Sequence, residues 1–253
     1  MGTGLQTGQL YKGLASSTTD SNLALVQSQD HIPGYIYTGG LDWGRSAVDE
    51  AGCTAIDPSN DDIMYAVNRF GGVLYKSTNR GASFSGVFSF SSFPGAWNSP
   101  VVVSPADPLT LFYGTSRIFR STTGGTAFAD ISGILDGGNQ ALCLGVPSTT
   151  LDTLYAGMGP LVNNADVFRW VNGAGWTNIT GALPDRYPMD LRVDPTDAAT
   201  VYIAMGGFGS GHVFKSTNAG ATWTDISGIL PDAPATSIAI DPLEQREARP
   251  LTD

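Results

Sequence analysis

The stretch Val213-Phe214-Lys215-Ser216-Thr217-Asn218-Ala219-Gly220-Ala221-Thr222-Trp223 decides the fold of this chain. β-forming residues flank a Ser-Thr-Asn-Ala-Gly segment, whose glycine can take the positive φ that a tight turn needs. The same pattern recurs at residues 74–84 and 118–128, and in degenerate form at 168–176. The repeat predicts strand–turn–strand hairpins at intervals along the chain.

A second repeated feature is a strand containing tyrosine, with 42 to 48 residues between successive copies: Tyr65, Tyr113, Tyr155 and Tyr202. A short apolar strand that ends at a proline lies before each tyrosine, and proline stops a strand because it cannot donate to the ladder. Each repeat therefore holds four strands, which we call A to D. This spacing predicts an all-β protein, a β-propeller of four-stranded antiparallel blades.

The repeats divide the chain unevenly. We expect four clear blades within 53–235, at about 53–90, 100–135, 141–183 and 189–230. Residues 1–52 are interpreted as a partial or degenerate blade, 236–243 as strand A of a further or closing blade, and 244–253 as a frayed tail. The favoured architecture is an incomplete or fragmentary propeller, which would lack the remainder of a larger one. The alternative is a closed five-bladed ring.

The amino-acid composition limits the kinds of molecule that the protein is expected to bind. The 253 residues include only three Lys and three Glu, which disfavours helices, and the net charge is −10. An acidic surface repels the phosphates of nucleic acids. No apolar run approaches the roughly 20 residues of a membrane span. We expect Cys53 and Cys143 to be buried thiols. His31 and His212 lack zinc-ligand spacing, so no metal or cofactor is expected.

The hairpin sequences resemble the Asp-box, or BNR repeat, Ser-x-Asp-x-Gly-x-x-Trp, of sialidases, sortilin-type receptors, xyloglucanases and photosystem II assembly factors. The resemblance covers about 53–242, although the Asp position holds Asn or Thr. It implies a propeller in which these residues close turns on the outer rim, away from the usual binding face. The residues concerned are Ser77, Asn79, Gly81, Phe84, Ser121, Thr123, Gly125, Phe128, Ser216, Asn218, Gly220 and Trp223.

The resemblance also allows a test for catalysis. Sialidase chemistry needs a Tyr-Glu pair, but the only Glu before the tail is Glu50. In xyloglucanases a Tyr-Ala-x-x-Asp-x-Gly-Gly segment carries a catalytic Asp, and residues 65–72 resemble it with Arg69 at that position. Asp42, Asp49 and Glu50 remain candidates for the paired carboxylates of a glycoside hydrolase, which lie roughly 5–10 Å apart.

The B–C loops and D–A connections vary between repeats and lie at the same end of the strands, so they are the expected binding face. Our leading interpretation is a non-catalytic binding or scaffold propeller, outside the cytoplasm, that recognises carbohydrate or protein there. No leader is visible, so this location supposes that one has been removed. The alternatives are a glycoside hydrolase, or a fragment of one, and an assembly factor that docks a protein. The candidate ligand-binding residues are Arg69, Phe70, Trp97, Asp136, Asp166, Asp185, Tyr187 and Phe208, although Trp97 and Tyr187 could instead cover the edge of the core.

Overall fold

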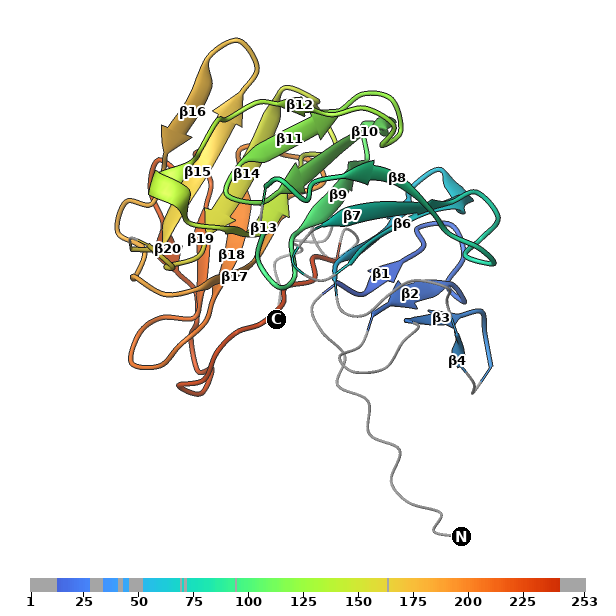
Figure 1. Cartoon of the computed structure of the whole chain (residues 1–253). Helices are drawn as coiled ribbons and strands as arrows, with labels where there is room; N and C mark the ends of the chain where they lie inside the picture. The colour runs from blue at the N-terminus through green and yellow to red at the C-terminus, as the bar shows by residue number, and fades with distance from the viewer. Residues whose placement is uncertain are drawn as a thin grey trace, which may run out of the picture.

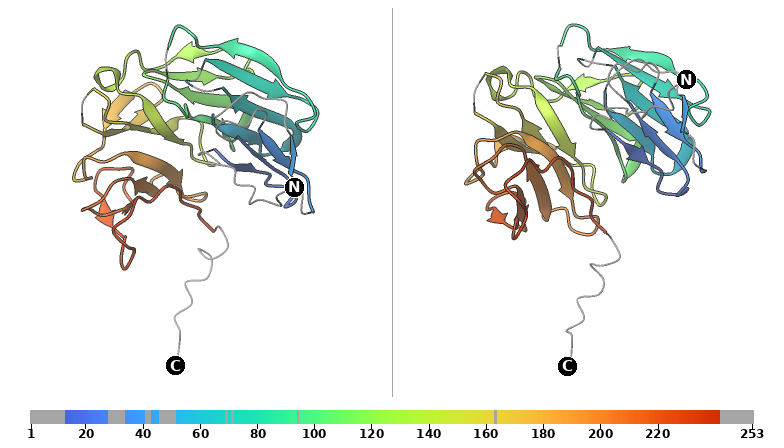
Figure 2. Two further views of the ribbon diagram at one scale, coloured as in Figure 1. Left: turned by 60° about the horizontal axis from the view of Figure 1, so that its bottom comes forward. Right: turned by 90° about the horizontal axis from the view of Figure 1, so that it is seen from below.

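The computed structural model describes residues 13–27, 34–40, 43–45, 52–68, 70, 72–93, 95–162 and 164–241. These residues form a β-propeller of four-stranded antiparallel sheets, as the repeat spacing predicts. The described residues form five such blades, which is the number predicted by the alternative of a five-bladed ring and not by the favoured incomplete propeller. Figure 2 shows them side by side in sequence order, from blade 1 in blue to blade 5 in orange.

Each blade runs A to D in chain order from its inner to its outer strand (Figure 1). Blade 1 consists of β1 (Ala15–Ser16), β2 (Ala24–Val26), β3 (Tyr35–Tyr37) and β4 (Trp43–Arg45). Blade 2 consists of β5 (Thr54–Asp57), β6 (Asn60–Val67), β7 (Val73–Ser77) and β8 (Ser85–Ser89). Blade 3 consists of β9 (Val101–Ser104), β10 (Asp107–Gly114), β11 (Ile118–Ser121) and β12 (Ala129–Asp130).

Blade 4 consists of β13 (Ala141–Gly145), β14 (Thr153–Met158), β15 (Asp166–Val171) and β16 (Gly175–Asn178). Blade 5 consists of β17 (Pro188–Val193), β18 (Val201–Met205), β19 (Val213–Ser216) and β20 (Thr224–Asp225). One 3₁₀ turn, η2 (Asp136–Gly138), lies between blades 3 and 4. Blade 1 is built from the segment for which the sequence predicts only a partial or degenerate blade. The sequence signal is weak there because the strands have only two or three residues each.

The core is divided between neighbouring blades. One cluster of buried side chains fills each of the four junctions, and the junction of blades 2 and 3 contains Tyr65, Phe90 and Tyr113. The rings of Phe90 and Tyr113 stack with centroids 4.0 Å apart. Burial and nearby Asp57 raise the pKa of Tyr65 to about 12, so its hydroxyl stays protonated and donates to the carbonyl of Gly124 in blade 3. The repeated tyrosines thus contribute both to packing and to blade registration.

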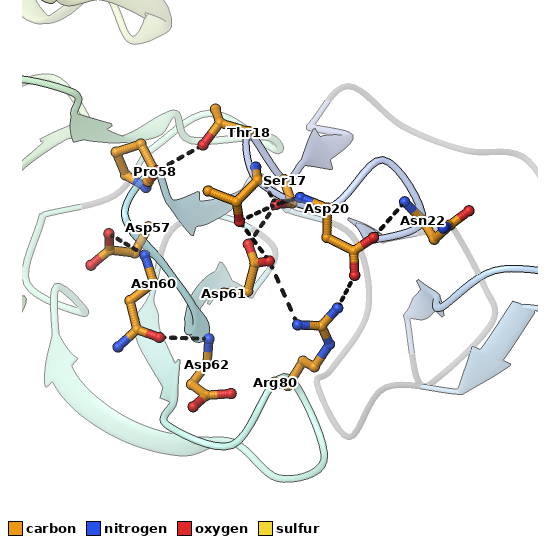
Figure 3. A network of polar contacts seen from close by, with 11 residues as sticks. Ser17, Thr18, Asp20, Asn22, Asp57, Pro58, Asn60, Asp61, Asp62 and Arg80 are labelled. Atoms are coloured by element: carbon orange, nitrogen blue, oxygen red, sulfur yellow. Dashed lines mark hydrogen bonds and ion pairs between the residues drawn. The ribbon is translucent and has the colours of Figure 1, made fainter.

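Polar contacts also join blades 1 and 2 (Figure 3). Ser17 donates to Asp61 at 2.5 Å, and Thr18 donates to the carbonyl of Pro58 at 2.7 Å. The Arg80 guanidinium, which comes from the C–D turn of blade 2, pairs with both Asp20 and Asp61. These contacts compensate for the short strands of blade 1.

The segment after blade 5 lies along its innermost strand, β17. The amide of Ile238 and the hydroxyl of Ser237 both donate to the Asp190 carboxylate, at 3.0 and 3.2 Å. Residues 235–241 have no strand assignment. The rest of the predicted terminal strand, 242–243, and the predicted tail at 244–253 lie outside the described residues.

Candidate functional site

The candidate site is the loop face, which we define as the B–C loops and D–A connections at one end of the blades. In blades 2, 4 and 5, a D–A connection holds a B–C loop by hydrogen bonds. The conformation of each loop is therefore set by a segment that is distant in sequence.

In blade 2 the B–C loop presents Phe70, and the connection that follows β8 holds it. The Phe70 amide donates to the carbonyl of Trp97 at 3.3 Å, and the Gly95 amide donates to the carbonyl of Phe70 at 3.2 Å. The two rings meet edge to face with centroids 4.7 Å apart. Phe70 is 54% exposed, whereas Trp97 is half-buried beneath it. Of these two predicted site residues, Phe70 is thus the one presented to solvent.

Phe70 has a strained backbone, with φ at +57°. A bulky side chain rarely adopts this left-handed conformation. The other described non-glycine residues with positive φ are Arg80 and Ala219, in C–D turns, and Asp136, on the loop face. Local strain of this kind persists only where the surroundings enforce it, and it is concentrated at functional sites.

In blade 4 the B–C loop is held by Asn139, which is completely buried. Its side-chain oxygen accepts the amides of Leu161 and Val162 at 2.9 and 2.7 Å, and its amide group donates to the carbonyl of Asn164. Leu161 and Val162 are 61% and 65% exposed. The buried amide thus supports an apolar loop tip.

Two predicted carboxylates, Asp136 and Asp166, meet beside Asn139. Their carboxyl groups are close enough to interact, and the interaction favours a proton on Asp136. Asp136 also accepts a bond from the Asn139 amide at 2.8 Å, and Asp166 accepts one from Thr180. Burial raises the pKa of Asp136 to about 6; the Asn139 bond opposes this rise, and the Asp166 charge adds to it.

The remaining predicted ligands lie around blade 5. The Asp185 carboxylate accepts the amide of Ala165 at 2.8 Å, so it braces the loop of blade 4. Its neighbour Arg186 donates to the carbonyl of Phe208, and Tyr187 accepts the Gly206 amide on its carbonyl. The rings of Tyr187 and Phe208 are both exposed.

Two residues of this region were not singled out as ligands from the sequence alone. The Asp232 carboxylate accepts the amide of Gly209 at 2.7 Å and lies 3.2 Å from Nε2 of His212. His212 is buried. Asn139 was likewise missed, because the loop groups that it holds are backbone groups more than 20 residues away.

The predicted turn residues lie at the C–D hairpins. The Ser216 hydroxyl accepts the amide of Gly220 at 2.8 Å, and the Asn218 carboxamide accepts that of Thr222 at 2.9 Å. Ser77 and Asn79 make the matching bonds in blade 2, and Ser121 and Thr123 do so in blade 3. The Trp223 indole donates to the carbonyl of Ile179 in blade 4. These side chains are engaged in closing the turn and in contacting the preceding blade.

Several predictions fall outside the described residues, namely those for Asp42, Asp49, Glu50 and Arg69. Within the described ranges, Cys53 and Cys143 are buried thiols. The same ranges contain no group of three or more His, Cys, Asp or Glu side chains arranged to hold a metal ion. They also contain no helix long and apolar enough to cross a membrane.

No protein-family model matches the chain. Over 207 residues it is 25% identical to a xyloglucanase of Hypocrea jecorina (strain QM6a), a match that covers 78% of this chain and 21% of that enzyme. The fold is similar to that of the GH74 enzyme of Niastella koreensis, with a TM-score of 0.65, 24% identity and coverage of 85% of this chain and 38% of that one. It is also similar to YCF48 bound to D1 peptide, with a TM-score of 0.52, 12% identity and coverage of 87% and 70%. The chain thus spans about a fifth of the curated relative, and the structural likenesses concern the fold.

Proposed function

We propose that this chain is a non-catalytic binding propeller of the Asp-box type that holds a carbohydrate chain on its loop face, outside the cytoplasm. The observation that carries this proposal is Phe70: an aromatic ring presented to solvent from a left-handed backbone, supported edge-on by Trp97. Exposed Tyr187 and Phe208 on blade 5 add two further rings to the same end of the molecule.

A left-handed conformation costs roughly 1–2 kcal/mol for a residue with a Cβ, and the Phe70 ring, which is 54% exposed although it packs on Trp97, offsets only part of this cost by burial in the free protein. A ligand that covers the ring offsets the rest, because burial of a phenylalanine side chain is worth about 1.5–3 kcal/mol. Pyranose rings present such an apolar face, and the 25% identical relative is a xyloglucanase. The first ligand to test is therefore xyloglucan.

The carboxylates favour binding over hydrolysis. A glycosidase needs two carboxyl groups roughly 5–10 Å apart that are free to act on the substrate, whereas Asp136 and Asp166 accept hydrogen bonds from Asn139 and Thr180. Asp185 and Asp232 hold loop amides. The glycoside hydrolase alternative therefore depends on Asp42, Asp49 and Glu50.

The test is binding of xyloglucan oligosaccharides by isothermal titration calorimetry. Phe70→Ala should weaken binding about 10- to 100-fold, the equivalent of the burial energy lost. The matched control is Leu109→Ala, which removes another exposed apolar side chain, 58% accessible, from the opposite end of blade 3. Equal affinities for wild type and Phe70→Ala would show that the Phe70 ring does not bind the sugar. Release of reducing ends by the wild type would instead favour the hydrolase alternative.

A second candidate, docking of a protein, is favoured by the blade 4 loop tip. Leu161 and Val162 are among the most exposed apolar side chains of the described residues, and Asn139 fixes their backbone. Adjacent exposed apolar residues of this kind mark protein contacts. Loss of a co-purified or cross-linked partner in a Leu161→Ser/Val162→Ser variant, with sugar binding intact, would support docking; retention of the partner would exclude this loop tip.

A further inference from the structure

One register position recurs in blades 2 to 5. An aromatic residue on strand B lies opposite a cationic residue on strand C in every one of these blades. The four pairs are Tyr65–Lys76, Phe112–Arg120, Tyr155–Arg169 and Tyr202–Lys215.

In three of these pairs, the cationic side chain is engaged by contacts within the fold. Lys76 lies 5.4 Å from the centroid of the Tyr65 ring and donates to the carbonyl of Gly124 at 3.0 Å. The Arg120 guanidinium lies over the rings of Phe112 and Trp170. Lys215 lies 5.1 Å from the ring centroid of Tyr202. Such cation–π contacts stabilise a partly buried charge.

Arg169 departs from the pattern. The Nε atoms of Arg120 and Arg169 are both buried without a hydrogen-bond partner, but among the described residues Arg169 also has no other side-chain hydrogen bond, no ion pair and no stacked ring. Its strand partner Tyr155 donates instead to the carbonyl of Ala198 at 2.9 Å. A buried donor without an acceptor is costly, and a guanidinium without a counterion is notable in a chain of net charge −10.

Arg169 also lines a pocket of about 250 Å³ at the junction of blades 4 and 5. Residues 177–179 and 181 of blade 4 and the C–D turn of blade 5, residues 219–221, complete its wall. Thr177 is directly opposite Arg169 in the ladder, so the two side chains are on the same face. The volume is below the roughly 300–1,000 Å³ of pockets for drug-sized ligands, so a single small ring fits better than a chain.

The Arg169 guanidinium and the Thr177 hydroxyl are the polar groups on this face of the ladder. The side chain of Asn178, the next residue of the strand, lies on the opposite face, where its oxygen accepts the amide of Thr180 at 2.9 Å. Ile179 and the methyl groups of Ala219 and Ala221 supply an apolar wall. The pocket thus combines one cation, one hydroxyl group and a small apolar surface.

We propose that this pocket is a binding site for a carboxylate-bearing sugar ring, that is, a uronic acid. The planar guanidinium of Arg169 binds the carboxylate in a bidentate manner. Thr177 binds a ring hydroxyl, and the alanine methyl groups contact the ring face. The site lies between the sheets and shares none of the loop-face residues, so it is independent of the function proposed above.

The test uses calorimetric titration of the full chain with glucuronic acid, glucose and inorganic sulfate. Glucuronic acid should bind, glucose should bind at least about 10-fold more weakly, and Arg169→Gln should lose about 10- to 100-fold in affinity for glucuronic acid. Lys215→Gln is the matched control, because it removes the equivalent cation of blade 5, and it should leave binding unchanged.

Three outcomes would overturn the proposal. Equal affinity for glucose and glucuronic acid would show that the charge is not recognised. Binding of sulfate without binding of glucuronic acid would show a site for inorganic anions. Unchanged binding in Arg169→Gln, with a melting temperature equal to that of the wild type, would exclude the pocket. Thr177→Val serves as a second variant, expected to weaken binding less than Arg169→Gln because it removes a neutral hydrogen bond.

Discussion

Replacing Asp136 with asparagine should abolish most of the pH dependence of the blade 4 loop at residues 159–166. In the folded protein Asp136 is protonated over a wider range than usual, because it is partly buried and meets the Asp166 carboxylate. In Asp136→Asn the side-chain amide can donate to Asp166 at every pH. In the wild type the Asp136 carboxyl group can donate only when it is protonated, that is, in acid. Asparagine also tolerates the φ of +51° at this position.

The size of the expected change in stability follows from the pKa of Asp136, which rises from an ordinary 3.8 to about 6. Since the folded state favours the protonated form, the stabilisation is complete below pH 3.8 and is lost as the pH rises through about 6. In a fully buried site this difference would amount to about 3 kcal/mol. Asp136 is substantially exposed, and screening by solvent reduces the expected effect to about 1 kcal/mol.

Hydrogen exchange of the Leu161 and Val162 amides is the appropriate assay, because both donate to Asn139, which itself binds Asp136. After correction for intrinsic rates, wild-type protection should fall about 5-fold between pH 4.5 and 7.5, the equivalent of 1 kcal/mol. Protection in Asp136→Asn should stay constant.

The control is Asp152→Asn, which changes an exposed carboxylate elsewhere in blade 4 that is bonded to Asn172. This variant should keep the pH dependence of the wild type. Wild-type protection that is equal at both pH values would refute the reasoning, as would titration of the Asp136 carboxyl carbon near pH 4.

Three further predictions concern stability. Ser216→Ala removes the acceptor of the buried Gly220 amide and should lower the free energy of unfolding by about 1–3 kcal/mol in chemical denaturation; a loss below about 0.5 kcal/mol would contradict the role of the serine in the turn. Gly220→Ala should cost more, because φ is +85° and the new Cβ would lie 2.3 Å from Cδ1 of Ile179; a wild-type melting temperature would disprove this. Asp190→Ala removes the acceptor of Ile238 and Ser237, so limited proteolysis should cut residues 235–241 faster, and an unchanged cleavage rate would show that Asp190 does not anchor the segment.

The sequence is sufficient to predict the fold class because its signal is local and repeated. Ser216 and Gly220 are four residues apart, and their bond closes a turn whose copies recur at blade spacing. Blade 1 lacks this signal. Its strands β1 and β4 have two and three residues, too few for an alternating pattern, and Arg80 of blade 2 pairs with Asp20 in the loop between β1 and β2.

The loop face could be located from the sequence, but its construction could not. Antiparallel topology alone brings the B–C loops and D–A connections to one end. The contact between Asp136 and Asp166, by contrast, joins two blades across 30 residues, and Asn139 recognises backbone groups that any sequence at 161–164 would supply. The positive φ of Phe70 likewise depends on Trp97 and Gly95, and no residue preference signals it.

The division of the core into four separate clusters, each belonging to one pair of neighbouring blades, has a mechanical consequence. Because each blade is bound chiefly to its neighbours, the free energy of the propeller approximates a sum of junction terms. A molecule stretched between its ends in an optical trap should therefore unfold in a series of separate steps. Each step would release one blade, or about 15 nm of extended chain for 42 to 48 residues, and the height of each step would measure one junction.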